Sequence, residues 1–194
     1  MSPSFQTVRQ SYASLAALYI DMFGATSQVD ADDLALIGRH LTGTVVDAGC
    51  GPGHLTAYLR SLGVSASGID LVPEFIAHAR ATHPDVPFHI GSMDDVEGPV
   101  DGILSWYSLI HRPPHELDGV LARFRRVLKP GGTLVVGFFD GDEVVPFPHK
   151  VTTAYFWPVD EFAARLVKAG FTEVERQRRP TDGPRRAHAA IAAR

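Results

Sequence analysis

The chain has 194 residues, 45% of them hydrophobic, and no apolar run near the ~20 residues that a membrane-spanning helix needs. This length fits one folded domain, and the formal net charge of −4 at pH 7 argues against general affinity for nucleic acid, which depends on positive charge. The only cysteine, Cys50, excludes an internal disulfide and a cysteine-rich metal cluster.

Residues 1–5 lack a basic region followed by an apolar core, so we expect no secretory signal, a cytoplasmic location and no membrane partner. The following segment predicts a helix, because apolar side chains recur at spacings of three and four along one stripe: Val8, Tyr12, Leu15, Ala16, Tyr19 and Phe23. A second short helix is expected from Asp30, as its N-cap, to Leu41.

The rest of the chain alternates between strands and helices. Strands are expected at residues 44–48, 64–69, 86–90, 101–106 and 133–139, and helices at residues 53–62, from Pro73, at 114–128 and from Pro158 to Gly170. Residues 140–157 form a long connection, which is typical of a lid or binding loop. Residues 171–178 and 187–193 predict a final antiparallel pair. This alternation predicts an α/β fold with a mainly parallel sheet covered on both faces.

The most informative segment is residues 45–53, in which apolar residues lead into Gly49, Gly51 and Gly53. Glycine takes positive φ and lets a ligand approach the main chain, so this pattern predicts a strand that ends in a ligand-binding turn. Asp70 lies 19 residues after Gly51, at the end of the next apolar segment. A carboxylate at this spacing is placed to accept hydrogen bonds from both ribose hydroxyls of an adenosine-bearing ligand.

The glycine spacing discriminates between such ligands. A dinucleotide fingerprint needs a small residue where this chain has His54, which argues against a dehydrogenase. An acidic residue followed by Gly-x-Gly-x-Gly instead resembles the cofactor loop of class I S-adenosylmethionine (SAM)-dependent methyltransferases. Further blocks of this family follow in order at residues 68–71, 91–96 and 124–132, and the last looks like the family's R-V-L-K-P-G-G block. The resemblance covers roughly residues 8–175.

The resemblance implies a Rossmann-like, doubly wound seven-stranded sheet of order 3-2-1-4-5-7-6, whose last hairpin is antiparallel, with N-terminal lid helices. It further implies a single SAM-binding domain over residues 1–194, in which residues 1–41 form the helical lid and residues 42–194 the core. SAM is the implied cofactor and S-adenosylhomocysteine (SAH) the product.

The resemblance also assigns cofactor contacts. Gly49 and Gly51 pass close to the methionine part of SAM, with Cys50 between them as a compact lining residue rather than a nucleophile. Asp47 helps to fix the loop and reaches toward the ammonium group through water. Asp70 holds the ribose diol.

Around adenine, the resemblance places Leu71 over one face and Met93 against the other edge. Ser92 or Asp94 accepts a hydrogen bond from the exocyclic amine. The alternative for residues 92–95 is a simple capped turn, and the sequence leaves both readings of Asp94 open.

Tyr12 and Tyr19 look like the tyrosines of a Y-x-x-x-A-x-x-Y segment that small methyltransferases of this family fold over the cofactor. The match is partial, because Ala13 stands where the family often carries an acid. The same helical spacing suits core packing, so a cofactor-covering role for Tyr12 is a hypothesis beside a structural one.

Residues 105–114 follow the fourth strand and contain an aromatic wall, with Trp106 assigned to the cofactor site and His111 as the titratable group. Histidine occurs at this position in the family, and an ordinary pKa near ~6.5 suits it to take a proton from a hydroxyl or amine. Its alternative role is to hold the loop through a hydrogen bond to a backbone carbonyl. In residues 138–157, aromatics interleaved with His149 favour a flat, mostly apolar acceptor.

Several absences narrow the chemistry. Residues 105–108 replace the N-P-P-Y segment of amide- and base-modifying methyltransferases, and no cysteine stands near the fourth or fifth strand to attack a base. We expect no metal, since Asp140 and Asp142 alone do not make a carboxylate cluster. The arginine-rich residues 177–186 are expected to be a solvated hairpin tip, with residues 180–184 in the turn.

The sequence therefore predicts a methyltransferase that moves a methyl group from SAM to an oxygen or nitrogen of a small, aromatic or amphipathic metabolite. The partner is a small-molecule acceptor, nucleic acid is disfavoured, and the sequence carries no signal for an oligomeric state. Two alternatives remain: an RNA-modifying methyltransferase that uses the arginine-rich end, and a SAM-binding protein without catalytic activity.

Overall fold

The computed structural model describes residues 3–183 and 185–194, and the side chains from residue 6 onward within that range. Its main sheet has the order β3-β2-β1-β4-β5-β9-β8. The strands are β1 (Thr44–Ala48), β2 (Ser65–Asp70), β3 (Phe88–Ile90), β4 (Val100–Trp106), β5 (Leu128–Phe139), β8 (Glu173–Arg179) and β9 (His188–Ala193). Strands β1 to β5 pair in parallel, and β9 pairs antiparallel with both β5 and β8. The predicted fold class and strand order are confirmed.

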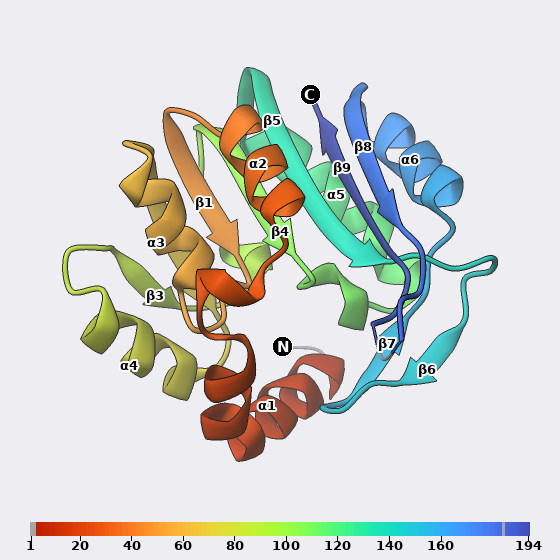
Figure 1. Ribbon diagram of the computed structural model, residues 1–194. Helices are drawn as coiled ribbons and strands as arrows, with labels where there is room; N and C mark the ends of the chain where they lie inside the picture. Colours follow the sequence, from red (N-terminus) through yellow and green to blue (C-terminus); the bar gives the residue numbers. More distant parts are fainter. Residues whose placement is uncertain (1–2, 184) are drawn as a thin grey trace.

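The helices lie on both faces of this sheet (Figure 1). They are α1 (Pro3–Phe23), α2 (Ala31–His40), α3 (His54–Ser61), α4 (Pro73–Thr82), α5 (Pro114–Val127) and α6 (Val159–Lys168), with short 3-10 turns η1 (Thr26–Gln28), η2 (Met93–Asp95) and η3 (Leu109–His111). The carboxylate of Asp30 accepts a hydrogen bond from the N–H of Asp32, as expected for an N-cap. No helix among the described residues is long and apolar enough to cross a membrane.

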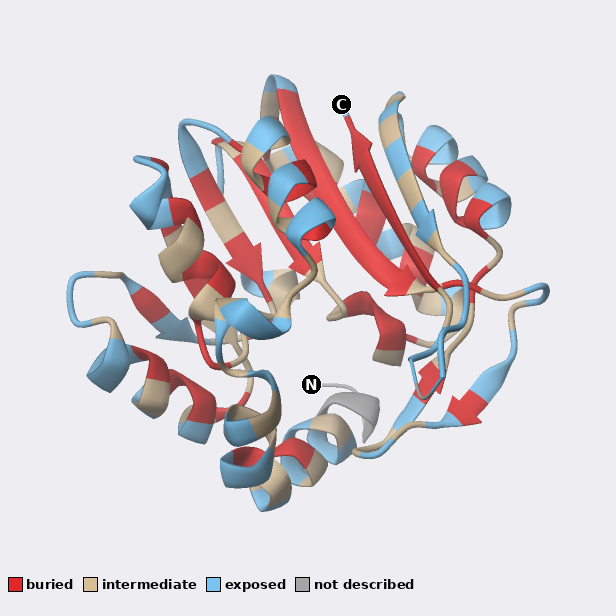
Figure 2. Ribbon diagram, in the orientation of Figure 1, coloured by how far each residue is buried: buried red, intermediate tan, exposed pale blue. Residues whose placement is uncertain are grey.

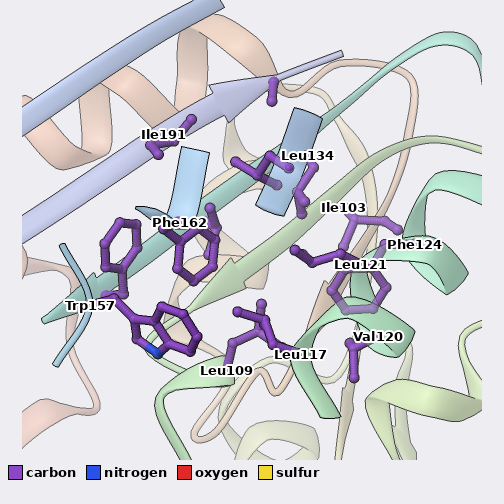
Figure 3. Packing of buried hydrophobic residues seen from close by; sticks show 14 of the residues in the cluster. Ile103, Leu109, Leu117, Val120, Leu121, Phe124, Leu134, Trp157, Phe162 and Ile191 are labelled. Carbon is purple, nitrogen blue, oxygen red and sulfur yellow. The ribbon is translucent and has the colours of Figure 1, made fainter. Parts of the chain in front are cut away.

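Strand β5 divides the core into two layers, because alternate side chains of a strand point to opposite faces. Leu134, Val136 and Phe138 pack with α5 and α6, whereas Val135 packs with α2 and α3. The strands at the centre of the sheet are buried along most of their length (Figure 2). Figure 3 shows the α5 and α6 layer, in which Phe162 stacks on Phe138 with ring centroids 4.2 Å apart.

The two N-terminal helices occupy different places. Helix α1 lies across the edge at which the arrows of β1 and β4 end (Figure 1). Helix α2 instead covers a sheet face, where Leu36 and Ile37 are fully buried among strand residues. Helix α2, which was expected in the lid over residues 1–41, therefore belongs to the core, because its apolar stripe packs against the sheet.

The expected loop at residues 140–157 contains a small antiparallel ribbon of β6 (Pro146–Pro148) and β7 (Thr153–Tyr155). Its base is closed: Trp157 donates its N–H to Phe139 O at 3.0 Å, and Gly141 donates its N–H to Trp157 O at 3.3 Å. The ribbon leaves the sheet and lies toward the N-terminal end of α1 (Figure 1). The long connection thus has a regular structure of its own, and its two ends meet at the end of β5.

Two of the four arginines expected in a solvated tip are ion-paired; Arg178 still has a 59% exposed side chain, and only Arg179, at 34%, departs from that expectation. Arg178 lies 2.7 Å from the buried carboxylate of Asp140, and Arg179 donates two hydrogen bonds of 2.6 Å to the buried carboxylate of Asp33. Both arginines belong to β8, which the buried acids hold in place. Residue 184 of the expected turn lies outside the described residues.

Candidate active site

A cavity opens at the edge of the sheet where the parallel strands end. It lies where the strand order reverses beside β1, which is where open α/β sheets bind ligands. Its lining combines the ends of β1, β2 and β4 with α1: Val8, Tyr12, Tyr19, Gly49, Gly51, Ile69, Asp70, Leu71, Val72, Phe75, Gly91, Met93, Trp106, Tyr107, Ser108 and His111. The predicted site residues Tyr12, Gly49, Gly51, Asp70, Leu71, Met93, Trp106 and His111 are therefore brought together.

The two cavity glycines have different structural reasons to be glycine. Gly49 has φ +86°, and a Cβ there would lie 2.3 Å from the Cβ of Ser108. Gly51 has φ +52°, yet a Cβ there would meet no protein atom within 4 Å. Gly49 therefore serves packing of the protein, while Gly51 leaves open space beside the main chain at the cavity.

Asp70 stands in the wall of the cavity and ties the loops around it. One carboxylate oxygen accepts a hydrogen bond from the N–H of Gly51 and the other from the N–H of Val72, both at 2.9 Å. Burial raises the pKa of Asp70 to about 6, and the backbone hydrogen bonds oppose that rise. Each oxygen has a second lone pair, so the carboxylate retains acceptor capacity toward a ligand.

Asp47 does not line the cavity; it lies beneath the loop. The hydroxyl of Thr56, on α3, donates a hydrogen bond of 2.7 Å to its carboxylate. Burial raises the pKa of Asp47 to about 7, and the neighbouring charge of Asp70 adds to this. The predicted role in fixing the loop agrees with this link between β1 and α3.

The Cys50 side chain faces away from the cavity, which differs from its expected place in the lining. It packs in a small cluster with Ile76, Ala79 and Phe88 under α4. Burial raises the pKa of the thiol well above its ordinary value. The main chain of Cys50 is also engaged within the protein, since its N–H donates to Ile69 O at 3.1 Å and its carbonyl accepts the N–H of Gly53 at 3.0 Å.

The segment after β3 divides into lining and supporting residues. Met93 lines the cavity with Leu71, whereas Ser92 and Asp94 are outside the lining. The Ser92 hydroxyl accepts the Asp94 N–H at 3.1 Å, as in a capped turn. The Asp94 carboxylate accepts a hydrogen bond of 2.6 Å from Arg112, whose guanidinium is buried. Sequence reasoning missed Arg112, because an arginine after a titratable histidine gives no sign of its distant partner.

Aromatic rings from α1 and α4 cover the cavity. Tyr12 meets Tyr19 and Phe75 edge to face, with ring centroids 5.3 and 5.8 Å apart. Burial and the charge of Asp70 raise the pKa of Tyr19 to about 12, and burial raises that of Tyr12 well above its ordinary value. Both hydroxyls therefore stay protonated at neutral pH.

His111 links the two covers of the cavity. Its Nε2 lies 2.8 Å from the hydroxyl of Tyr12 on α1, and its Nδ1 lies 2.8 Å from the carbonyl oxygen of Thr153 on β7. A carbonyl can only accept, so Nδ1 carries the proton, and in the neutral ring Nε2 accepts from Tyr12. Burial lowers the pKa of His111, which favours this neutral form. Both roles considered for His111, base and loop support, are compatible with this geometry.

The chain between Trp106 and His111 closes the cavity against the glycine turn. Ser108 donates a hydrogen bond of 2.6 Å to Ala48 O. The ring of Trp106 packs over Gly137, where a Cβ would lie 2.7 Å from the indole. Tyr107, which the sequence placed in the aromatic wall without a role of its own, also lines the cavity. Among the described residues, no group of three metal-ligating side chains gathers.

A glycine turn, an acid at the end of β2 and a cavity where the strand order reverses define a Rossmann-like domain of the class that binds adenosine-bearing ligands. A family model described as "Methyltransferase domain" matches residues 45–132. By fold and sequence the chain carries the domain of the class I SAM-dependent methyltransferases.

Individual relatives agree with this assignment. The chain is 29% identical over 133 residues to a malonyl-[acyl-carrier protein] O-methyltransferase of Pectobacterium atrosepticum, covering 66% of this chain and 51% of that protein. It is 33% identical over 153 residues to a dTDP-3-amino-3,6-dideoxy-alpha-D-glucopyranose N,N-dimethyltransferase of Streptomyces fradiae, covering 75% of this chain and 55% of that protein. The chain thus spans about half the length of the curated relatives it matches.

A solved structure resembles nearly the whole chain. It is the Burkholderia thailandensis 1,6-didemethyltoxoflavin-N1-methyltransferase with bound 1,6-didemethyltoxoflavin and SAH. The match has a TM-score of 0.82 at 25% identity and covers 97% of this chain and 87% of that one.

The buried carboxyl of Asp47 should make stability depend on pH. Its pKa rises from 3.8 to about 7 on folding, so the folded state favours the protonated form. The contribution of this protonated carboxyl to the free energy of unfolding is lost as pH rises from about 4 to about 7. Asp47→Asn keeps an acceptor for Thr56 and stays neutral. The free energy of unfolding of this variant, relative to the wild type, should therefore increase with pH, by at most about 1.4 kcal/mol per pH unit.

Urea unfolding between pH 4 and pH 8 measures this difference. Asp118→Asn is the matched control, because hydrogen bonds from Lys168 and Arg165 lower the pKa of Asp118. Removing that carboxylate should cost stability as pH rises above about 4, which is the opposite sign. An Asp47→Asn variant whose relative stability does not change with pH would show that Asp47 is ionised in the fold.

Proposed function

We propose that the protein is a SAM-dependent methyltransferase that transfers a methyl group to an oxygen or nitrogen of a small, aromatic or amphipathic acceptor. The observation that carries this proposal is the single cavity that joins Gly51, Asp70 and an Nε2 of His111 free of its own proton. A cofactor turn and a proton acceptor in one enclosed space are what transfer to a hydroxyl or amine requires.

The residues present fit the cofactor. Open space beside Gly51 admits the methionine part, and the spare lone pairs of Asp70 can accept from the ribose hydroxyls. Leu71 and Met93 flank the position of adenine. Tyr12 and Tyr19 cover the cavity, so α1 serves as its lid. The lid and the core together form a single domain. Gly49 and Trp106 complete the cofactor wall, whereas Asp47, Cys50, Ser92 and Asp94 support it from behind.

Bound SAM supplies a methyl group on a sulfonium, which is already reactive toward a nucleophile held in line. The protein supplies alignment and exclusion of water, and orientation alone can contribute up to ~7–11 kcal/mol. His111 supplies a proton acceptor: Thr153 O holds its ring with Nε2 toward Tyr12. An acceptor hydroxyl or amine that takes the place of Tyr12 at Nε2 can pass its proton directly to His111.

The surroundings of His111 support a flat acceptor. The ring centroid of His149 lies 5.4 Å from that of His111, 5.8 Å from that of Phe139 on β5 and 6.2 Å from that of Phe147 on β6. The relatives named above act on an acyl-carrier-linked acid, an amino sugar nucleotide and a fused heterocycle. These are small or carrier-linked acceptors, and the ion pairs of Arg178 and Arg179 argue against an RNA footprint at β8.

Two measurements test the function. Calorimetry should show binding of SAM and SAH, and transfer of a labelled methyl group should occur to at least one acceptor in a panel. The panel contains 1,6-didemethyltoxoflavin, a malonyl-acyl carrier protein, a 3-amino-sugar nucleotide, a pooled metabolite extract and total RNA. Labelled RNA would favour the RNA-modifying alternative, and binding without transfer to any acceptor would favour a non-catalytic SAM-binding protein.

Asp70→Ala should raise the dissociation constant for SAH at least tenfold. The variant removes a charged acceptor for the ribose diol, which is worth ~1.5–3 kcal/mol. Calorimetry measures the constant, and circular dichroism checks the fold, because the Gly51 and Val72 amides also lose their acceptor. Unchanged affinity in a folded variant would remove Asp70 from the cofactor site.

Gly51→Ala should weaken SAH binding because its Cβ points into space that only a ligand fills. Gly63→Ala is the matched control: φ there is +83° and a Cβ also meets nothing within 4 Å. Both variants carry a left-handed alanine and should lose ~1–2 kcal/mol of stability in urea unfolding. Only Gly51→Ala should lose affinity; equal affinities would mean that no ligand approaches Gly51.

His111→Ala should lower the rate of transfer by ~10²–10⁴ while changing SAH affinity only a few-fold, if His111 is the general base. His111→Asn can still donate to Thr153 O but cannot take a proton at neutral pH. His115→Ala, at an exposed position nearby, is the control. Rates are measured with the acceptor that the panel identifies. Near-normal turnover of His111→Asn would show that His111 only shapes the cavity.

A further inference from the structure

A chain of polar side chains runs behind the cavity wall, from α2 through β9 to the residue after β4. The Asp33 carboxylate lies 3.3 Å from Nε2 of His188, and Nδ1 of His188 forms a hydrogen bond with the hydroxyl of Tyr107. Asp33 and His188 are each only 2% exposed. Only Tyr107 of these three residues lines the cavity.

The charges of this chain fix its direction. Arg179 donates two hydrogen bonds of 2.6 Å to Asp33, and Arg179 together with the neighbouring His188 ring holds the pKa of that carboxyl below its usual range despite burial. An ionised carboxylate can only accept, so Nε2 of His188, which faces Asp33 at 3.3 Å, is the nitrogen that carries a proton toward it. Nδ1 of the same ring pairs with the Tyr107 hydroxyl.

Tyr107 itself is held in an unusual conformation. It is the one non-glycine residue with positive φ, +53°, among residues 3–183 and 185–194. Its N–H donates to Gly137 O at 2.9 Å, and its ring lies 4.9 Å from that of Phe139. Bulky side chains rarely take this conformation, and those that do are held by their surroundings, often at functional sites.

The residue that follows carries this constraint into the cavity. Ser108 packs directly on Gly49 of the glycine turn and hydrogen-bonds Ala48 O, and the chain then continues into η3 with His111. The turn at Tyr107 therefore sets the position of His111 relative to the glycine turn. A change of its backbone conformation would move both walls of the cavity.

We propose that Asp33, acting through His188, holds Tyr107 as a positioning residue that fixes the spacing between the cofactor turn and His111. This inference deepens the proposed function and rests on it. Arg179 completes the device, since it neutralises a carboxylate that would otherwise be buried without a cation.

The test compares Tyr107→Phe, Asp33→Asn and the double variant. Tyr107→Phe keeps the ring and removes only the link to His188, so it is expected to fold. Each single variant should weaken SAH binding by about three- to tenfold in calorimetry, and the double variant should be no weaker than the weaker single variant, because both cut the same chain. Asp118→Asn, which breaks an ion pair with Arg165, should leave SAH affinity unchanged.

Proton NMR gives a readout that a purely structural role would not move. The His188 Nε2 proton facing Asp33 should give a low-field imidazole N–H resonance, identified by its loss in His188→Gln. It should disappear in Asp33→Asn and persist in Tyr107→Phe. Addition of SAH should shift it in the wild type, and the shift should be absent in Tyr107→Phe, where the link to the cavity is cut.

The outcomes separate this inference from the function on which it rests. Two results together would overturn the inference and leave the methyltransferase proposal standing: normal SAH affinity in Tyr107→Phe, and a wild-type His188 N–H resonance that does not shift when SAH is added. Effects of the two substitutions that multiply in the double variant would show independent structural roles and would also overturn it. A wild-type protein that does not bind SAH would refute the proposed function, and this inference with it.

Discussion

The carboxylate of Asp70 holds together the two loops on which the cavity depends. It accepts the N–H of Gly51 after β1 and the N–H of Val72 at the start of α4, so each oxygen fixes one loop. Burial raises the pKa of this group to about 6, which means that the fold tolerates a carboxylate here only because backbone amides compensate it. The aromatic cover formed by Tyr12 and Tyr19 keeps water from the same group. The position of the two loops, the enclosure of the cavity and its electrostatics therefore all depend on the carboxylate of Asp70.

Three buried acids around the sheet show three ways of compensating charge. Asp33 is ionised against Arg179 and His188, whereas Asp70 relies on backbone amides. Asp47 receives only the Thr56 hydroxyl, and burial raises its pKa to about 7. Asp33, which is outside the cavity lining, has an arginine partner, whereas Asp70, which lines the cavity, is compensated by backbone amides. A ligand that brings a positive charge and hydroxyl donors to this edge would compensate the carboxylates of Asp47 and Asp70 further.

The sequence predicted the parts of this structure that repeat a local pattern. The strands and the meeting of Gly51, Asp70 and His111 follow from glycine spacing, apolar periodicity and the rule that parallel strands end at one edge, whereas the strand order came from the resemblance to the methyltransferase family. Strand β5 begins at Leu128, and the sequence predicted a start at residue 133. The prediction was late because the Pro and Gly residues at positions 130–132 are typical of a turn. The ribbon of β6 and β7 contains prolines that suggest a loop, and its strands pair only with each other. The contact of Arg179 with Asp33 spans 146 positions, and no local signal reports such a distance.

The closed base of the β6 and β7 ribbon has a consequence for how this domain diversifies. Gly141 donates a hydrogen bond to Trp157 O, and Trp157 donates one to Phe139 O of β5, so these contacts at the sheet close the insertion. The entropy of closing a loop grows only slowly with its length, so the segment between Gly141 and Trp157 can lengthen, shorten or be exchanged with little effect on the sheet. The exchange has limits inside the ribbon, because Phe147 and Ala154 are buried in the core and Thr153 O holds His111. A ribbon that keeps these three contacts can change in length and sequence elsewhere.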